Sequence, residues 1–196
     1  MKATLRMVDD VMPPGACLIA AFISPAEESE FVERLDGEVW SGELKRRVQH
    51  FGYRYDYRAR AVTRDAYLGP LPAWLQDLGK RLVDAGHVAD LPDQVIANEY
   101  LPGQGISAHI DCEPCFDDTI VSLSLLSHCT MVFREIHDGS TLSAVLQPRS
   151  AIVLKDVSRY HWTHEIPARK SDVIDGRKVG RSRRISLTFR KTIRVL

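Results

Sequence analysis

The sequence predicts a mainly β fold of the α+β class, in which a sandwich or barrel of short strands follows two helices. Three observations predict it. From residue 94 to the C-terminus, short extended runs alternate with turn signals, a spacing typical of all-β sandwiches and barrels. The first half instead contains two apolar patterns at helical spacing. The 196 residues are enough for one hydrophobic core, so we expect a single domain.

The first expected helix begins after Ser24. Ser24 suits the cap position, Pro25 suits the first helical position, and Glu27 can complete a capping box. Its apolar pattern ends near Gly37. A second helix is expected over residues 71–85, where four apolar residues recur at helical spacing. They are Trp74, Leu75, Leu78 and Leu82.

Eight strands are expected in the second half, because short apolar or alternating runs are separated there by turn residues. Their ranges are 95–101, 106–111, 119–126, 130–136, 141–146, 151–155, 160–166 and 184–192. The long charged segment 168–183 contains Asp175-Gly176, so it is expected to be a mobile flap or a hairpin tip.

The last strand has two different faces. Arg184, Ser186, Thr188 and Arg190 alternate with three apolar residues, so they share one face of the strand. A polar face must turn either to water or into a polar cavity. Two arginines on such a face favour a cavity that binds a carboxylate, since guanidinium groups pair with carboxylates in bidentate fashion.

A metal site is expected around His109 and Asp111. In an extended chain these two side chains lie on one face, as do those of Asn98 and Tyr100. The best third ligand is His164, because His161 falls on the opposite strand face. Two histidines and one aspartate suit a non-haem Fe(II) that activates O2, since three protein ligands leave coordination positions open.

Charge is unevenly distributed although the whole chain is neutral. Residues 43–64 hold seven Lys or Arg against two acidic residues, and residues 168–183 hold six against two. In the first of these segments, Tyr53, Tyr55 and Tyr57 alternate as in a strand, and arginines are interleaved with them. Bases stack on such rings and arginines meet phosphates, although a β-hairpin with a charged outer face would show the same pattern.

Taken together, these motifs closely resemble the AlkB family of Fe(II)/2-oxoglutarate dioxygenases in order and spacing. The resemblance covers about residues 22–191, because residues 46–53 are similar to the family's nucleotide-recognition lid. It implies a double-stranded β-helix, or jelly roll, with N-terminal flanking helices. About residues 1–92 would form the helices and lid, and about residues 93–196 the catalytic core.

The resemblance also implies the cofactors and the roles of the site residues. Fe(II) would be bound by His109, Asp111 and His164. The co-substrate 2-oxoglutarate would be held by Asn98, Tyr100, Arg184 and Arg190. The expected reaction uses O2 to convert 2-oxoglutarate to succinate and to hydroxylate a C–H bond. Where that carbon is attached to a ring nitrogen, the product loses formaldehyde and the free base remains.

Nucleic acid is the expected partner, as tRNA or as alkylated single-stranded DNA or RNA. The residues expected to contact it are Arg46, Arg47, Tyr53, Tyr55 and Glu113. Within the family, the amino-acid sequences of these motifs are most similar to those of the branch that hydroxylates a modified wobble uridine in tRNA. The larger members of that branch carry an RNA-recognition module and a methyltransferase domain, both missing from this sequence. tRNA modification and repair of alkylated bases therefore both stay open.

Three other interpretations fit part of the sequence. Cys112-x-x-Cys115 beside His109 suggests zinc, but a deaminase-like site needs its histidine well upstream of the cysteines. A jelly roll that binds nucleic acid without catalysis would not need the complete set of metal and carboxylate ligands. The same reaction could act on a protein or lipid substrate, but such a substrate would not explain the basic, aromatic lid.

The sequence has no run of about eighteen apolar residues and no signal-peptide pattern. A cytoplasmic location and no membrane association are therefore expected, and a monomer is the simplest state. The four cysteines are expected to be thiols in a reducing compartment. They are Cys17, Cys112, Cys115 and Cys129.

Overall fold

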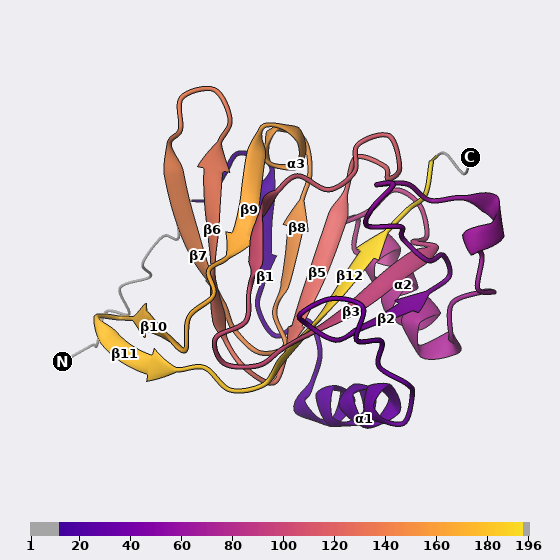
Figure 1. Cartoon of the computed structure of the whole chain (residues 1–196), viewed down its shortest axis with the longest axis horizontal. Helices are drawn as coiled ribbons and strands as arrows, with labels where there is room; N and C mark the ends of the chain where they lie inside the picture. The colour runs from indigo at the N-terminus through magenta and orange to yellow at the C-terminus, as the bar shows by residue number, and fades with distance from the viewer. Residues whose placement is uncertain (1–11, 194–196) are drawn as a thin grey trace.

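Two antiparallel β-sheets face each other in the computed structural model, which describes residues 12–193, and two helices cover the outer side of the larger sheet (Figure 1). This is the double-stranded β-helix arrangement that the resemblance implied. No helix in the described part of the chain is long and apolar enough to cross a membrane.

The two expected helices are confirmed. Helix α1 (Pro25–Asp36) is capped by Ser24, whose hydroxyl accepts a hydrogen bond from the Glu27 N–H at 3.2 Å. In return the Glu27 carboxylate accepts from the Ser24 N–H at 2.8 Å, which completes the capping box. Helix α2 (Ala73–Asp84) starts two residues later than expected, after Pro72. Phe31 of α1 stacks on Trp74 of α2, with ring centroids 4.9 Å apart.

The larger sheet contains six strands in the order β1-β8-β5-β12-β3-β2. Their bounds are Ala16–Ile19 (β1), Ala151–Leu154 (β8), Ile120–Leu125 (β5), Arg184–Arg190 (β12), Gln94–Tyr100 (β3) and Val48–Phe51 (β2). The first and last of these are the sheet edges, and neither was among the eight expected strands. Both are four residues long, too short to show a clear alternation. The first half of the chain therefore supplies strands to the sheet as well as helices.

The smaller sheet contains four strands in the order β4-β9-β6-β7. Their bounds are Ile106–His109 (β4), Trp162–Ile166 (β9), Cys129–Glu135 (β6) and Thr141–Leu146 (β7). A short helix, α3 (Val157–Tyr160), precedes β9. The charged segment 168–183 is a hairpin, β10 (Ser171–Ile174) and β11 (Arg177–Gly180), with Asp175-Gly176 at its turn. One 3-10 turn, Arg64–Ala66, lies between β2 and α2.

The larger sheet packs on both faces, and β12 at its centre shows why. Ile185, Leu187 and Phe189 are at most 1% exposed and pack toward the two helices. The intervening residues of β12 face the smaller sheet, where a second apolar cluster includes Phe116, Phe133 and Trp162. The apolar residues of β12 therefore face the apolar layer between the larger sheet and the helices, and its polar residues face the space between the two sheets.

We predict that Glu27→Gln lowers the stability of the protein at pH 7 by about 1 kcal/mol. The Glu27 carboxylate also pairs with Arg81 of α2 at 2.6 Å. The hydrogen bond from Arg81 lowers the pKa of Glu27 from 4.5 to about 2. Because the folded pKa is depressed, this stabilisation is present above pH 4.5 and is lost as the pH falls toward 2. Urea unfolding should show the same difference from wild type at pH 7 and pH 5, and a smaller one at pH 3.

The matched control is Glu30→Gln, because Glu30 pairs with Arg34 on the surface of α1. Both side chains are about half exposed, so the change should cost about 0.3–0.5 kcal/mol. Equal losses for the two variants at pH 7 would contradict the assigned role of the Glu27–Arg81 pair.

Candidate metal centre and cosubstrate cavity

Three ligand-type side chains meet at one end of the smaller sheet. β4 pairs with β9 so that His109 lies directly opposite His164, and the two ring centroids are 4.4 Å apart. Asp111 lies two residues beyond the end of β4, outside the strand that the sequence predicted to include it. One ligand atom from each of the three residues lies within 4.8 Å of the others. The arrangement matches a metal bound on one side by two imidazoles and a carboxylate.

Burial and neighbouring charges set the protonation of this group. Burial alone would raise the pKa of Asp111, but Arg190 and the two imidazoles hold it well below its usual range. Burial and the nearby His109 lower the pKa of His164 to about 3. At neutral pH the carboxylate is therefore charged and the His164 imidazole neutral, as metal binding requires.

Hydrogen bonds orient two of the three side chains. The Nδ1 of His109 lies 2.8 Å from the Ser107 carbonyl oxygen, so this nitrogen donates and Nε2 keeps its lone pair. Arg190 Nη2 donates to Asp111 Oδ1 at 2.5 Å. The other carboxylate oxygen, Oδ2, points to His164, 3.6 Å from its Nε2. These hydrogen bonds leave His109 Nε2 and Asp111 Oδ2 for a metal ion.

A disulfide lies directly beside this cluster, and it corrects the expectation of four thiols. Cys112 and Cys115 are bonded to each other, whereas Cys17 and Cys129 are free. A tight turn, in which the Cys115 N–H donates to the Cys112 carbonyl at 3.2 Å, brings their Cα atoms to 5.3 Å. That separation lies within the range a disulfide needs. The sequence showed the spacing of the cysteines but not this turn.

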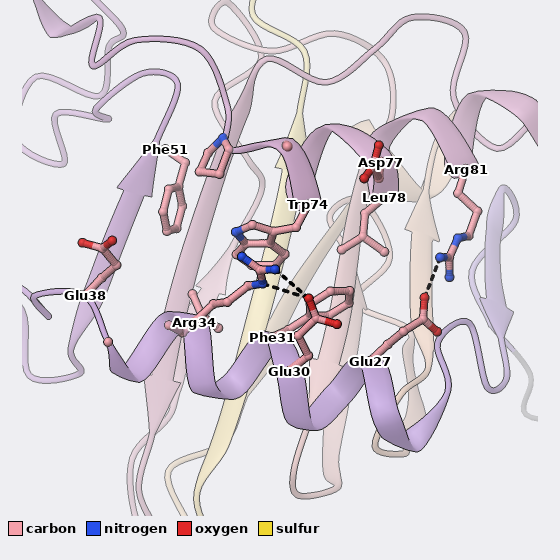
Figure 2. Close-up of a pocket in the computed structure, with 14 residues that line it drawn as sticks. Glu27, Glu30, Phe31, Arg34, Glu38, Phe51, Trp74, Asp77, Leu78 and Arg81 are labelled. Carbon is pink, nitrogen blue, oxygen red and sulfur yellow. Dashed lines mark hydrogen bonds and ion pairs between the residues drawn. The ribbon is translucent and has the colours of Figure 1, made fainter.

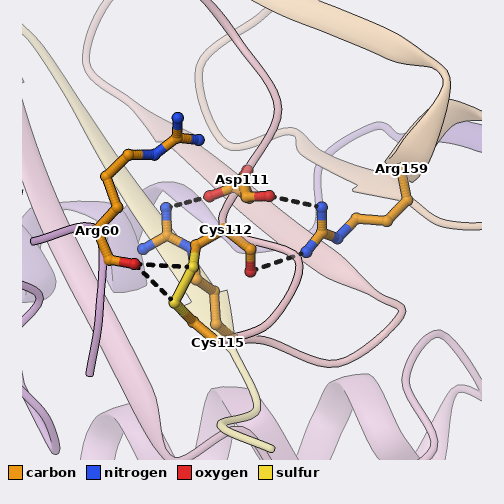
Figure 3. The surroundings of a disulfide bond; sticks show 6 residues. Arg60, Asp111, Cys112, Cys115 and Arg159 are labelled. Carbon is orange, nitrogen blue, oxygen red and sulfur yellow. Dashed lines mark hydrogen bonds and ion pairs between the residues drawn. A yellow bond between two sulfur atoms is a disulfide. The ribbon is translucent and has the colours of Figure 1, made fainter. Parts of the chain in front are cut away.

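Figure 3 shows how the backbone around the disulfide is held. Arg159 Nη1 donates to the Asp111 carbonyl at 3.0 Å, and the guanidinium also reaches the Cys112 carbonyl. The Arg60 carbonyl oxygen lies 3.2 Å from the sulfur of Cys112. Arg159 is only 2% exposed, so its hydrogen bonds hold the loop after β4 against the protein interior.

The cluster opens into a cavity of about 820 Å³ between the sheets. All four polar residues of β12 line it, so their face turns into a cavity rather than to water. They are Arg184, Ser186, Thr188 and Arg190. Asn98 and Tyr100, on the neighbouring strand β3, line the same cavity. The structure thus brings together all seven residues expected to hold metal and co-substrate.

Arg184 is the clearest anion-binding group in this cavity. Its side chain is buried and lies over the Tyr100 ring, 5.4 Å from the centroid. Nη2 donates to Ser124 Oγ at 2.8 Å, but Nε and Nη1 have no partner among the described residues. Burial raises the pKa of Tyr100, so its phenol stays protonated and can donate. A buried guanidinium with two unpaired N–H groups fits a carboxylate ligand.

The lid segment, residues 44–60, lies partly over the cavity and partly on other parts of the surface. Arg46 and Tyr55 line the cavity, and Arg46 Nε donates to Asn98 Oδ1 at 2.8 Å. Arg47 instead pairs with Glu99, on the opposite face of β3, through bonds of 2.5 and 2.7 Å.

The other two expected contact residues also lie outside the cavity lining. Tyr53 packs on Tyr67, with ring centroids 5.0 Å apart. Glu113 is exposed, in the loop that follows Asp111.

Four cavity residues of the lid were not among the predicted contacts: Leu44, Lys45, Tyr57 and Arg60. Tyr57 and Arg60 belong to the interleaved aromatic and basic run, which was the available signal. A turn closed by Asp56 and Ala61 directs this part of the lid back over the cavity. Alternation along a straight strand could not indicate such a turn.

A second hollow of about 620 Å³ lies on the outside, between α1 and α2 (Figure 2). Phe31 and Trp74 form its floor, and the Glu27–Arg81 and Glu30–Arg34 pairs lie along it. It shares no residue with the metal cluster. Glu38 and Asp77 also line it, but no group of metal-ligand side chains among the described residues lies there, so we assign the chemistry to the cavity between the sheets.

Comparison with known proteins decides the family. The family model described as 2OG-Fe(II) oxygenase superfamily matches residues 15–190. This chain belongs to that superfamily, and within it to the AlkB family. It is 36% identical to the tRNA (carboxymethyluridine(34)-5-O)-methyltransferase alkbh8 of Xenopus tropicalis, over 92% of this chain and 32% of that protein. It is equally similar to the alkylated DNA repair protein ALKBH8 homolog of Arabidopsis thaliana, over 91% and 58%.

Comparison with solved structures shows the same fold in another protein. The solved structure of OsALKBH1 superimposes with a TM-score of 0.70 at 18% identity, covering 92% of this chain and 98% of that one. Membership of the 2OG-Fe(II) oxygenase superfamily implies Fe(II), 2-oxoglutarate and O2 as cofactors, and the cluster of His109, Asp111 and His164 fits the metal. The chain spans about a third of the frog relative and little more than half of the plant relative.

Proposed function

We propose that this dioxygenase hydroxylates or oxidatively demethylates a modified base in nucleic acid. The observation that carries the proposal is the lid: Tyr55, Tyr57 and Arg60 line the same cavity as the metal cluster. Rings and a guanidinium at this position can stack on a base and approach its phosphates. The printed names of the relatives, a tRNA methyltransferase and a DNA repair protein, support the same class of substrate.

Each cavity residue has a role in this proposal. His109, Asp111 and His164 would hold Fe(II), which with 2-oxoglutarate and O2 supplies the oxidation of a C–H bond. Arg184 would pair with one carboxylate of 2-oxoglutarate, and the Tyr100 phenol would donate to it. Arg190, which the resemblance assigned to 2-oxoglutarate, also pairs with Asp111 Oδ1, keeps that carboxylate charged and would leave Oδ2 to hold the metal. Asn98, held by Arg46, would orient the co-substrate from β3.

The lid would exclude water and position the base. The Tyr57 hydroxyl is buried without a partner among the described residues, so it can bond a polar group of the substrate. Burial raises the pKa of both Tyr55 and Tyr57, which keeps these phenols neutral and able to donate.

The test is succinate release from Fe(II) and 2-oxoglutarate, with total tRNA or methylated single-stranded DNA as stimulant. Wild type should show release that rises with one of the two nucleic acids, which identifies the substrate class. The variant His109→Ala/Asp111→Ala should show none. Metal-dependent release that neither nucleic acid stimulates would redirect the proposal to a protein or lipid substrate.

We predict that Arg58→Glu/Arg60→Glu weakens nucleic-acid binding about tenfold or more at low salt. Both side chains are exposed on the lid, and Arg60 also lines the cavity. Because each lost phosphate contact removes counterion release, the slope of log Kd against log salt should fall by about one per contact. Fluorescence anisotropy across a salt series measures both quantities.

The control variant is Arg34→Glu/Lys80→Glu, which reverses the same number of charges on the outer helices. It should leave the affinity and the salt slope unchanged. Equal weakening by the two variants would indicate attraction by overall charge and would contradict a lid-specific interface.

A further inference from the structure

A second group of metal-ligand side chains lies outside the cavity, at the end of the smaller sheet. Glu135 ends β6, and His137 lies in the turn between β6 and β7. His161 lies between α3 and β9, and β9 is the neighbour of β6 in the smaller sheet (Figure 1). Their ligand atoms lie within 4.8 Å of one another. None of the three lines the cavity between the sheets. The group is therefore separate from the cluster around Asp111.

The spacing of the two imidazoles fits a shared metal ion. His137 Nε2 lies 3.3 Å from His161 Nδ1, and the ring centroids are 5.5 Å apart. Two nitrogens bound to one tetrahedral Zn(II) at about 2.0–2.1 Å are about 3.3 Å apart. A hydrogen bond between the rings is the competing explanation, but such bonds are usually shorter, about 2.9–3.0 Å.

The backbone holds these groups in place before any ligand binds. Glu135 Oε2 accepts hydrogen bonds from the His137 N–H at 2.6 Å and the Asp138 N–H at 2.7 Å. The other oxygen, Oε1, stays available for a ligand. The Ile136 N–H donates to the His161 carbonyl at 3.0 Å, and Glu135 pairs with Trp162 across the sheet. The hairpin turn and the start of β9 are thus joined in one fixed arrangement.

We propose that Glu135, His137 and His161 form a second metal site that binds Zn(II). Two imidazoles and one carboxylate are ligands that Zn(II) accepts, with water in the fourth position. Both histidines are exposed, so the ion can enter directly from solvent. The bound ion would cross-link the β6–β7 turn to the start of β9, the strand that contains His164. The proposal does not depend on which nucleic acid is the substrate.

Zn(II) titration of the full chain in His109→Ala/Asp111→Ala background tests this site, because that background removes the catalytic cluster. Calorimetry should show one Zn(II) equivalent, lost on adding His137→Ala/His161→Ala and kept on adding His87→Ala. His87 belongs to neither ligand group, so it is the matched control. Glu135→Gln, which can still accept the turn hydrogen bonds, should weaken binding about tenfold or more by removing the negative charge.

NMR of the individual histidines tests the site without depending on whether the variants fold. In long-range ¹H–¹⁵N spectra, Zn(II) should shift the imidazole nitrogens of His137 and His161 and leave those of His87 unchanged. Zn(II) binding that survives the loss of both histidines would overturn the proposal. So would unshifted His137 and His161 signals at saturating Zn(II), which would leave a hydrogen bond between the rings as their only interaction.

Discussion

Asp111→Asn is expected to reduce succinate formation by more than about 100-fold. Even the loss of a residue that only hydrogen-bonds to a metal ligand typically lowers metal affinity or activity by about 10–100-fold. The change removes the negative charge of the metal cluster but keeps the shape of the side chain. The amide oxygen can still accept from Arg190, which now donates to Oδ1. Fe(II) affinity should fall together with turnover, because a neutral amide is a weak ligand for a divalent cation. Anaerobic Fe(II) titration and a succinate assay measure the two effects.

Asp175→Asn is the control, because this exposed residue lies at the tip of the β10–β11 hairpin in a conformation that Asn also accepts. It should match wild type in both assays. If Asp111→Asn unfolds, His109→Ala offers a second route, since His109 makes no ion pair with residues 12–193. Full turnover by either folded variant would remove Asp111 or His109 from the metal site.

Arg184→Met is expected to raise the KM for 2-oxoglutarate by about 10–100-fold, the value of a hydrogen bond to a charged group. The guanidinium is buried with two N–H groups unpaired among the described residues, so a carboxylate there would gain both. kcat at saturating 2-oxoglutarate should change much less, since Arg184 would hold the co-substrate at a distance from the reacting bond. The initial rate of succinate formation against 2-oxoglutarate concentration separates the two parameters.

Two comparisons make this result specific. Arg184→Lys keeps the charge but lacks the planar fork, so its KM should fall between those of wild type and Arg184→Met. Arg177→Met removes an exposed arginine from β11 and should leave KM unchanged. An unchanged KM in folded Arg184→Met would show that another group holds the carboxylate.

Local patterns predicted much of this structure, because they depend on backbone geometry alone. The Ser24-Pro25 cap placed α1, and the alternation along 184–190 separated the apolar face of β12 from its polar face. The motif around His109 and the distant His164 predicted the metal cluster, although the strand register that sets them opposite each other came from the structure. The same reasoning missed β1 and β2, since four residues are too few to establish a period.

Contacts between distant segments were decided by the tertiary structure. Arg46 and Arg47 are equivalent in sequence terms, yet the first enters the cavity and the second pairs with Glu99. The register of β2 on β3, with Val48 opposite Asn98, sends neighbouring side chains to opposite faces. The bond between Cys112 and Cys115 likewise depends on a turn held by Arg159.

The sequence by itself therefore determined the class of fold, the metal and co-substrate motifs, and the expected chemistry. The structure decided which lid residues reach the cavity, and it placed His137 beside His161 although 24 residues separate them. Helix caps, alternation and motif spacing are properties of neighbouring residues and can be read along the chain. Strand register and turn direction depend on how the whole chain packs, so the groups they bring together become visible only in three dimensions.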